Sequence, residues 1–584
     1  MKLHIETLIQ SALRALEQEG ELKAVPAFIQ VDATKNKQHG DYASNIALLL
    51  AKLENKPPRA LAEQIVSKLP ASARIKKIEV KGPGFINFFL SPEAFHQVVS
   101  AILTERNQYG RSKIGREKQI LVEFLSSNPT GPLHVGHGRN AALGDIVANL
   151  LEAIGFKVHR EYYVNDAGRQ MDILTVSIWL RYLALLGQDI MLPANAYRGE
   201  YIIDIAKAIY AKHHDEFVID SSDLLVDLPK DEPDGGDKEI YIDALIKRAK
   251  KCLGNRYVSV FDLGLAAILG DIRNDLSEFG VNYDQWFSER EFIKSDRVDH
   301  IITQLKEHGD VYEREGALWF RSTNYGDEKD RVIVRSNGER TYFAHDIAYH
   351  INKFERGFDL VVDIFGSDHH GYVPRIKAAI EALGIHPERL IYLLVQFVTL
   401  YRGHEQVQMS TRGGNFVTLR ELREEVGSDA ARFFYVMRKA EQHIDFDLDL
   451  AKSQSHDNPV YYIQYAYARI CSVFRQCAER EIIYDEAQGL SHLQLLVEPH
   501  EQQILNTLSQ YPDMIRRAAL NYEPCLLTTY LRELAADFHG YYNAHQFLTD
   551  DHALRNARLT LLSSVKQTLA NGFSLLRIEA KEEM

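Results

Sequence analysis

The pattern of hydrophobic and polar positions predicts a core of strands that alternate with helices. Residues Ile120–Leu125 form an apolar run rich in strand formers, and the apolar residues from Leu143 to Ile154 recur every three or four positions, as on one face of a helix. Gly155 is a natural end for that helix. Alternating strands and helices imply a parallel sheet with both faces covered, and such sheets bind ligands beyond the carboxyl ends of their strands.

The alternation returns in the second half of the chain. Between about residues 331 and 400 the strand-like runs are Val332–Arg335, Leu360–Phe365 and Leu390–Leu400. We predict that these runs restore the same sheet. Four loops would then converge at its carboxyl edge: 126–137, 340–346, 366–371 and 401–414. The amphipathic helical patterns between about residues 170 and 330 predict an insertion between the two halves of a split sheet.

The two ends of the chain predict different architectures. Residues 1 to about 110 combine helical patterns at Lys2–Glu19 and Ser44–Leu53 with two strand-like runs, Ile75–Lys81 and Phe85–Leu90, which a Gly-Pro-Gly turn joins. Residues 455–584 are helical almost throughout. The predicted fold class is therefore α/β: a split, Rossmann-like parallel-sheet domain at 117–454, a small α+β domain before it and an all-α domain after it.

Composition narrows the class of protein. The 584 residues are 45% hydrophobic and 26% charged, which is typical of a soluble globular protein. No apolar run approaches the roughly 20 residues that span a bilayer, so we expect no membrane association. Four cysteines in so long a chain indicate a reducing compartment, and we expect a cytoplasmic location. A net charge of −13 counts against extensive nucleic-acid coating, although it permits a partner held at a few sites.

The loop after the first strand carries the strongest candidate chemistry. It contains two prolines and a glycine and leads to two histidines, three residues apart, where the helix opens. Amides at a helix start attract phosphate, a glycine allows close approach, and imidazoles can donate hydrogen bonds to phosphate oxygens. The candidate nucleotide-binding residues are Asn128, Pro129, Thr130, Gly131, His134, Gly136 and His137. An ordinary strand–helix junction with two solvated histidines is the alternative.

Longer stretches of sequence resemble one family. NPTGPLHVGH resembles the HIGH signature of class I aminoacyl-tRNA synthetases, and VEFLSSNPTGPLHVGHGR is similar to arginyl-tRNA synthetases in particular. HGDYASNIAL and KGPGFINFFL resemble the N-terminal additional domain of that family, and Asp551-His-Ala-Leu-Arg555 resembles its DALR domain, which reads the anticodon.

The resemblance implies a reaction and its partners. ATP, with Mg²⁺ carried on its phosphates, would activate L-arginine as arginyl-adenylate, and the arginine would then be transferred to the 3′-terminal ribose of tRNA(Arg). Residues 1–110 would contact the tRNA, 117–454 would be catalytic with an insertion at about 170–330, and 455–584 would bind the anticodon. We expect a monomer and, because no hydrolytic constellation stands out in the insertion, no editing site.

An arginine substrate needs a carboxylate that can hold its guanidinium at two points. We choose Asp346, with Tyr342 four residues earlier on the same face of a helix. The resemblance implies that Asn128 and Glu123 also line the arginine pocket. A helix N-cap is the alternative role for Asp346.

The segment GSDHHG at 366–371 allows two interpretations. By resemblance it is the class I loop near ribose and substrate, with Gly366 and Asp368 at the nucleotide and His369 at the substrate. A DHH cluster could instead bind a catalytic metal, as in a phosphoesterase. No further Asp/His cluster has suggestive spacing, so we predict no protein-held metal site.

One loop departs from the family pattern. The KMSKS signature is replaced by Gln408-Met409-Ser410-Thr411-Arg412, so both lysines are missing. Arg412 is the predicted replacement for their catalytic charge, helped by amides near Gly413, and Met409 and Ser410 are predicted nucleotide contacts. A catalytically impaired tRNA-binding relative therefore stays open as an alternative to an active arginine–tRNA ligase.

Overall fold

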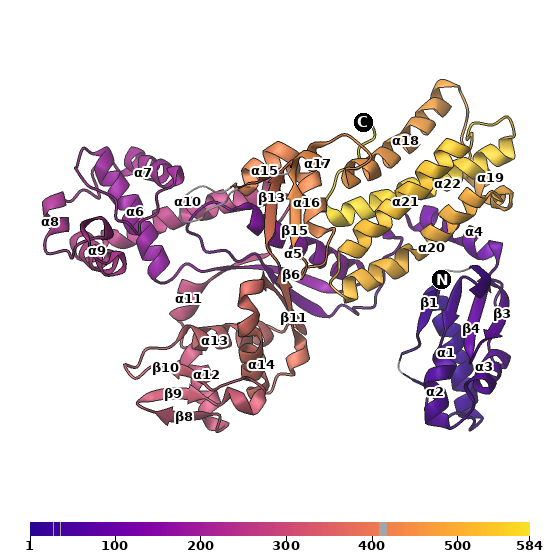
Figure 1. Cartoon of the computed structure of the whole chain (residues 1–584), viewed down its shortest axis with the longest axis horizontal. Helices are drawn as coiled ribbons and strands as arrows, with labels where there is room; N and C mark the ends of the chain where they lie inside the picture. Colours follow the sequence, from indigo (N-terminus) through magenta and orange to yellow (C-terminus); the bar gives the residue numbers. More distant parts are fainter. Residues whose placement is uncertain (27, 35–36, 404, 408–416) are drawn as a thin grey trace. The chain divides into compact units, whose positions relative to one another are not determined.

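The chain folds into two compact units, one formed by residues 1–112 with 454–584 and the other by residues 113–453 (Figure 1). This computed structural model describes every residue except 27, 35–36, 404 and 408–416. The parallel-sheet, α+β and all-α parts that the sequence predicts are all present, so the predicted fold class is confirmed.

The amino-terminal part of the first unit is an antiparallel sheet covered by helices. The strands have the order β1-β2-β4-β3, with bounds Val31–Ala33, Tyr42–Ser44, Ile75–Lys81 and Phe85–Leu90 for β1 to β4. The helices are α1 (Lys2–Gln18), α2 (Ile46–Glu54), α3 (Pro58–Ser67) and α4 (Pro92–Glu105). β3 and β4 pair as an antiparallel hairpin, which confirms the predicted pair of strands and its turn.

The carboxyl-terminal part of the same unit is a helical bundle. Its helices are α18 (Pro459–Glu479), α19 (Glu486–Ser491), α20 (Pro499–Leu520), α21 (Cys525–Ala544) and α22 (His552–Leu576). Asp551 caps α22, since its Oδ1 accepts from the amides of Ala553 and Leu554 at 2.9 and 3.1 Å. Asp551 of the DALR sequence thus sets the start of the last helix.

A five-stranded parallel sheet organises the second unit, with the order β12-β11-β5-β6-β7. Its strands are β5 (Gln119–Phe124), β6 (Lys157–Val164), β7 (Gln285–Ser288), β11 (Leu360–Gly366) and β12 (Leu390–Val395). Helix α5 (Val135–Ala153) packs on one face, where the ring of Phe124 lies against Gly144. Side chains alternate along a strand, so Leu121 and Glu123 point to the other face, which α13 (Tyr342–Glu355) covers.

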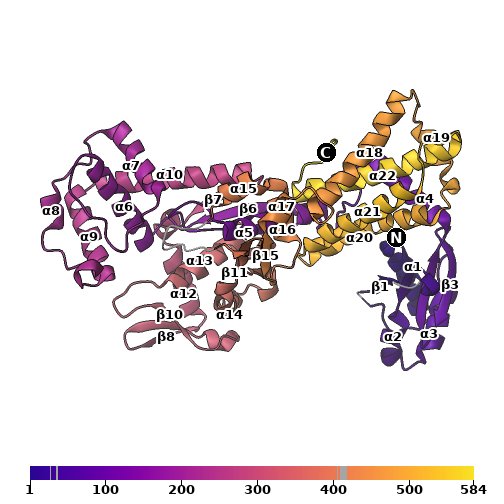
Figure 2. The same cartoon turned by 45° about the horizontal axis from the view of Figure 1, so that its top comes forward.

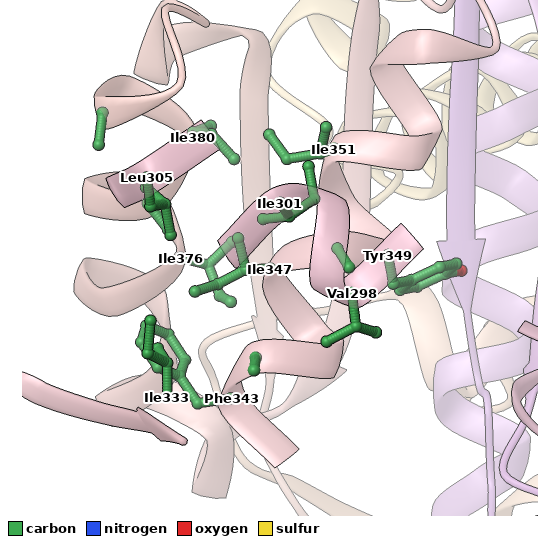
Figure 3. Close-up of a cluster of buried hydrophobic side chains, with 14 of the residues drawn as sticks. Val298, Ile301, Leu305, Ile333, Phe343, Ile347, Tyr349, Ile351, Ile376 and Ile380 are labelled. Carbon is green, nitrogen blue, oxygen red and sulfur yellow. The ribbon is translucent and has the colours of Figure 1, made fainter. Parts of the chain in front are cut away.

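A hydrophobic cluster lies under α13. It includes Leu121 of β5 and residues of α12 (Arg297–Glu307), α13 and α14 (Val373–Ala382). Figure 3 shows the side chains of Val298, Ile347 and Ile376 together, with Tyr349 at the edge of the cluster. The hydroxyl of Tyr349 leaves the cluster and reaches the charged groups of the sheet.

Helices between β6 and β7 form the insertion, which lies at one end of this unit in Figure 2. The predicted end at about residue 330 is wrong, because β7 already pairs with β6 in the parallel sheet. They are α6 (Arg169–Leu185), α7 (Glu200–His213), α8 (Ser221–Leu225), α9 (Lys238–Leu253) and α10 (Arg256–Glu278). Among the described residues no single helix is long and apolar enough to cross a membrane, and the only pair that passes together, α9 with α10, is bent by 115°.

One predicted strand and the second half of another lie outside the parallel sheet. The run at Val332–Arg335 becomes β10 (Arg331–Val334), which pairs antiparallel in a separate sheet with β9 (Ala317–Phe320) and β8 (Val311–Arg314). The run Leu390–Leu400 is divided, because the amide of Gln396 donates to the carbonyl of Ala440 and the chain leaves the sheet there. β13 (Val398–Arg402) then pairs with β15 (Ile444–Asp447), so loop 401–414 follows a different sheet from the one expected.

The remaining elements complete the second unit. They are α11 (Glu289–Ile293), β14 (Glu405–Gln406), α15 (Leu419–Val426), α16 (Ser428–Val436) and α17 (Leu448–Lys452). Arg432 of α16 and Asp145 of α5 form a buried ion pair, Nη2 to Oδ2 at 2.5 Å, which holds α5 against α16.

Replacing Gly144 by alanine tests the contact between α5 and the sheet. A Cβ at Gly144 would lie 2.2 Å from Cγ of the Phe124 ring, so we expect Gly144→Ala to lower the free energy of unfolding by about 1–3 kcal/mol. Gly270, in the exposed middle of α10, has nothing within 4 Å of its Cβ position, and Gly270→Ala should raise stability by up to about 1 kcal/mol. Urea unfolding measures both changes, and equal effects at the two glycines would contradict this packing.

Candidate active site

The start of α5 is built around its two histidines. His134 is the N-cap, and its Nδ1 accepts from the amides of Gly136 at 3.1 Å and His137 at 3.4 Å. In return, Nδ1 of His137 accepts from the amide of His134 at 3.3 Å. The two rings stack with centroids 3.6 Å apart. A Cβ at Gly136 would lie 3.0 Å from the His134 ring, so glycine leaves room for this arrangement.

These contacts fix the protonation of both rings. Burial lowers the pKa of His134, and it lowers the pKa of His137 well below its usual range. A nitrogen that accepts from an amide carries no proton, so each neutral ring has its proton on Nε2. The site can therefore donate from Nε2 to an anion without holding a full positive charge.

The amides of this helix start contribute less than the sequence led us to expect. Those of Gly136 and His137 already donate to His134, and the amide of Val135 donates to the carbonyl of Val417 at 3.2 Å. The expected phosphate cradle of open backbone amides is therefore wrong for these three residues. The side chains of His134 and His137 are the donors that the geometry offers.

The loop before α5 is tightly held. Leu125 and Ser126 have left-handed φ values of 69° and 42°, a conformation that costs energy in residues other than glycine. Asn140 of α5 secures the turn: its Oδ1 accepts from the amide of Leu125 at 2.6 Å, and its Nδ2 donates to the carbonyl of Ile364 at 3.0 Å. One side chain thus joins the carboxyl ends of β5 and β11.

The predicted nucleotide loop lies between this turn and the insertion. Asn128 is exposed, and its amide group bonds to the side chains of Asn165 and Gln170. Pro129 is buried, the carbonyl of Thr130 accepts from the hydroxyl of Tyr201 in α7 at 2.8 Å, and Gly131 approaches the same tyrosine.

Three carboxylates form a row across the α13 face of the sheet. Asp363 of β11, Glu123 of β5 and Glu161 of β6 are partners in strand register, and all are almost fully buried. Strands about 4.8 Å apart bring such charges close together, so they need countercharge. Lys353 of α13 supplies it, with Nζ 2.6 Å from Glu123 Oε2 and 2.7 Å from Asp363 Oδ1. Arg356 binds Glu161 Oε2 at 2.7 Å.

Both carboxylate oxygens of Glu123 are therefore bonded to other side chains of the protein. Its Oε2 lies 2.6 Å from Lys353 and 2.7 Å from the Tyr349 hydroxyl, and its Oε1 accepts from Ser126 at 3.0 Å. The structure places this predicted substrate residue in the network that holds α13.

Helix α13 brings Tyr342 and Asp346 to the carboxyl edge of the sheet. The helix has 14 residues and β11 has seven, so both are roughly 21–23 Å long. A connection of four residues joins them at the amino edge, and the helix therefore starts at the edge where β5 ends. A Cβ at Gly168, after β6, would lie 3.6 Å from the Tyr342 hydroxyl.

Asp346 is available for a ligand. Thr341 caps α13, with its Oγ1 3.4 Å from the Ala344 amide, so the N-cap alternative for Asp346 is wrong. Among the described residues the Asp346 carboxylate has no hydrogen bond or ion pair. Burial raises its pKa to about 6, against the opposing effect of the nearby His350.

Glu289 is a second buried carboxylate in this region, and its place there was not predicted from the sequence. Glu289 at the start of α11 is buried, and burial raises its pKa to about 7 although Tyr163 donates a hydrogen bond to it. Its Oε2 has no hydrogen-bond partner in the described structure, and Asp346 acts on it electrostatically. Two carboxylates with oxygens that accept no hydrogen bond in the described structure, acting on each other in one region, suit a cation with several donors, such as a guanidinium.

The segment after β11 forms the short 3₁₀ helix η5 (Ser367–Tyr372). It follows Gly366, and the side chains of Asp368 and His369 are exposed, 3.6 Å apart between Oδ2 and Nε2. The described residues include no group of three or more His, Cys, Asp or Glu that could hold a metal ion. The predicted residues Met409, Ser410 and Arg412 lie outside the described residues.

Comparisons with known proteins agree along the whole chain. The arginyl tRNA synthetase N terminal domain matches residues 3–90, the class I (R) tRNA synthetase catalytic domain matches residues 98–186 and 265–452, and the DALR anticodon binding domain matches residues 463–584. Arginine–tRNA ligases from Thioalkalivibrio sulfidiphilus and Coxiella burnetii are 59% and 54% identical, each over all of both chains.

Solved structures give the same picture. A Campylobacter jejuni crystal structure assigned as an arginyl-tRNA synthetase is 34% identical, with a TM-score of 0.72 over 85% of this chain and 100% of that one. The Thermus thermophilus arginyl-tRNA synthetase shares the fold, with a TM-score of 0.75 at 24% identity over 99% of this chain and 100% of that one.

Substituting Glu289 tests whether its ionised carboxylate lowers the stability of the folded protein. Its pKa is about 7 in the folded protein against an ordinary 4.5, so the folded state keeps a proton that the unfolded state loses. The stability contributed by that proton falls as pH rises from 4.5 to 7. We expect Glu289→Gln to raise the free energy of unfolding by about 1–3 kcal/mol at pH 8 and to change it little at pH 4.5.

The exposed neighbour Glu291 supplies the matched control, since Glu291→Gln should change stability little at either pH. Urea unfolding at the two pH values is the measurement. A Glu289→Gln variant that is less stable than the wild type at both would show that the carboxylate has a stabilising partner.

Proposed function

The chain belongs to the arginyl-tRNA synthetase family, and we propose that two groups of residues at the carboxyl edge of its parallel sheet divide the reaction between them. The chain is an ATP-dependent arginine–tRNA ligase, which forms arginyl-adenylate and transfers the arginine to the 3′-terminal ribose of tRNA. Full-length similarity to such ligases favours neither a catalytically impaired relative nor a metal-dependent phosphoesterase.

The histidines are proposed to act on ATP. The arginine carboxylate attacks the α-phosphorus, so two anions must meet, and the protein contributes positioning and hydrogen bonds to the oxygens that gain charge. Nε2–H of His134 and of His137 is the proposed donor pair. The proposed nucleotide contacts around them are Asn128, Pro129, Thr130, Gly131, Gly136, Gly366 and Asp368, with Met409, Ser410 and Arg412 from the loop that the structure does not describe.

The acidic residues are proposed to recognise arginine. Asp346 and Glu289 would accept from the guanidinium, whose charge would stabilise both ionised carboxylates. Tyr342 at the start of α13 and Asn128 in the facing loop are the proposed further contacts, with His369 at the exposed end of the site. Glu123 supports the pocket from beneath, because its oxygens are already bonded. The observation that carries this proposal is the Asp346 carboxylate, which lacks a direct partner among the described residues.

The other domains are proposed to bind the RNA. The matches of residues 3–90 and 463–584 to the N-terminal and DALR anticodon binding domains support contacts of both with tRNA(Arg). Mg²⁺ would arrive on ATP, held by phosphate oxygens and water. We further propose that the enzyme works as a monomer in the cytoplasm.

Charging of tRNA(Arg) tests the proposed reaction and the role of the histidines. Purified protein with ATP, Mg²⁺ and tRNA(Arg) should attach radiolabelled arginine and not lysine. His134→Asn keeps a side-chain oxygen that can cap α5 but removes the Nε2 donor, so we expect the charging kcat to fall by about 100-fold or more with an unchanged melting temperature. Charging of lysine alone, or undiminished charging by His134→Asn, would contradict the assignment.

Replacement of Asp346 separates the two parts of the site. Asp346→Asn removes the charge that faces the guanidinium, and a charged partner left unpaired costs about 2–5 kcal/mol. We therefore expect the KM for arginine to rise by at least about 30-fold and the KM for ATP to change little. Steady-state charging with each substrate varied gives both constants, and equal changes in the two would indicate a purely structural role.

A further inference from the structure

We propose that His350, which lies beneath the arginine pocket, is a positioning residue: a buried imidazolium that keeps Asp346 ionised for the guanidinium. The proposal rests on the proposed role of Asp346 and adds a residue that does not touch the substrate. His350 lies one helical turn after Asp346 and is almost fully buried.

The hydrogen bonds of His350 account for both ring protons. Nδ1 lies 2.7 Å from the carbonyl oxygen of Asp346, and a carbonyl only accepts, so Nδ1 carries a proton. Nε2 lies 3.0 Å from Oδ2 of Asp363. Lys353 and His350 outweigh the effect of burial and lower the pKa of Asp363, so this carboxylate is ionised and also accepts. A ring that donates from both nitrogens is positively charged.

The position of this charge distinguishes it from the other cations nearby. Lys353 is held between Glu123 and Asp363, and Arg356 is bound to Glu161. His350 is attached to the backbone of Asp346 itself. Besides burial, which raises the pKa of Asp346, His350 is the leading influence on it and acts to lower it.

Other titratable groups face this pair from every element packed around it. They are Lys353 on α13, Glu123 on β5, Tyr163 on β6, Glu289 on α11, Asp363 on β11, Tyr372 on η5 and Tyr392 on β12, whose hydroxyl lies 3.1 Å from Nε2 of His350. Most are acids or tyrosines, so loss of the imidazolium leaves Asp346 in surroundings that favour its protonated form.

The pH dependence of arginine binding follows from this arrangement. The guanidinium needs an ionised carboxylate, so arginine binding weakens as pH falls through the pKa of Asp346, about 6 in the wild type. Loss of a nearby opposite charge raises such a pKa by about one unit or more. At pH 6 the ionised fraction of Asp346 would then fall from about one half to about one tenth, whereas at pH 8 it would stay near one.

His350→Gln is the decisive variant. The KM for arginine in tRNA charging is measured at pH 6 and pH 8 for the variant and the wild type. We expect the variant-to-wild-type ratio to be about fivefold larger at pH 6 than at pH 8, with no such difference in the ratio for ATP. A variant that melts like the wild type and gives the same arginine ratio at both pH values would overturn the proposal.

Two further variants keep the outcome clear. Burial lowers the pKa of His345, so His345→Gln on the same helix removes little charge and should give equal ratios at both pH values. If His350→Gln does not fold, His350→Asn takes its place: it also removes the imidazolium with a smaller neutral side chain, and it should enlarge the arginine ratio at pH 6. Equal ratios for that variant would overturn the proposal, whereas wild-type charging of arginine tests the proposed function separately.

Discussion

Three carboxylates in strand register across the middle of a parallel sheet repel one another unless cations lie between or above them. In this protein Glu123, Glu161 and Asp363 form such a row, and Lys353, with no exposed surface, bridges two of them. A helix that packed on the sheet through apolar contacts alone could shift by a fraction of a turn at little cost. Ion pairs at fixed positions do not allow that shift, because an unpaired buried charge is strongly destabilising. The acidic row therefore fixes the position of α13, and with it the height of Asp346 at the edge of the sheet.

Helix α5 is fixed on the opposite face by different contacts. Gly144 lets it approach Phe124, and the buried pair of Arg432 and Asp145 holds it from the other side. Asn140 then links it to the ends of both central strands. Since α5 and α13 lie on opposite faces, the groups at their amino ends can share a ligand only at the carboxyl edge, as ligands do in open α/β sheets.

The sequence was sufficient wherever local patterns determine the structure. The hairpin of β3 and β4 has the predicted bounds, and β5 and α5 follow from an apolar run, a helical period and a glycine. The division of Leu390–Leu400 could not be predicted, because a backbone hydrogen bond to a residue more than forty positions away breaks an unbroken apolar run. The proposed roles of Glu289 and His350 could not be predicted for a related reason, since they depend on the register of distant strands. A usable signal did exist: an acid inside each of two apolar strands, Glu123 in β5 and Asp363 in β11, and a lysine on the helix that covers them.

The electrostatics of the two helix starts explain why one edge can receive both substrates. ATP is a polyanion, and a fully negative site would repel it. The groups near the α5 start are neutral imidazoles, which offer hydrogen bonds without attracting the carboxylates of the α13 side into ion pairs. Arginine carries a carboxylate at one end and a guanidinium at the other, so its own length can separate the two kinds of charge. The raised pKa values of Asp346 and Glu289 mean that ionising these acids costs energy, and a guanidinium bound there as proposed would offset that cost. The proposed imidazolium of His350 lowers the cost of ionising Asp346 before arginine binds.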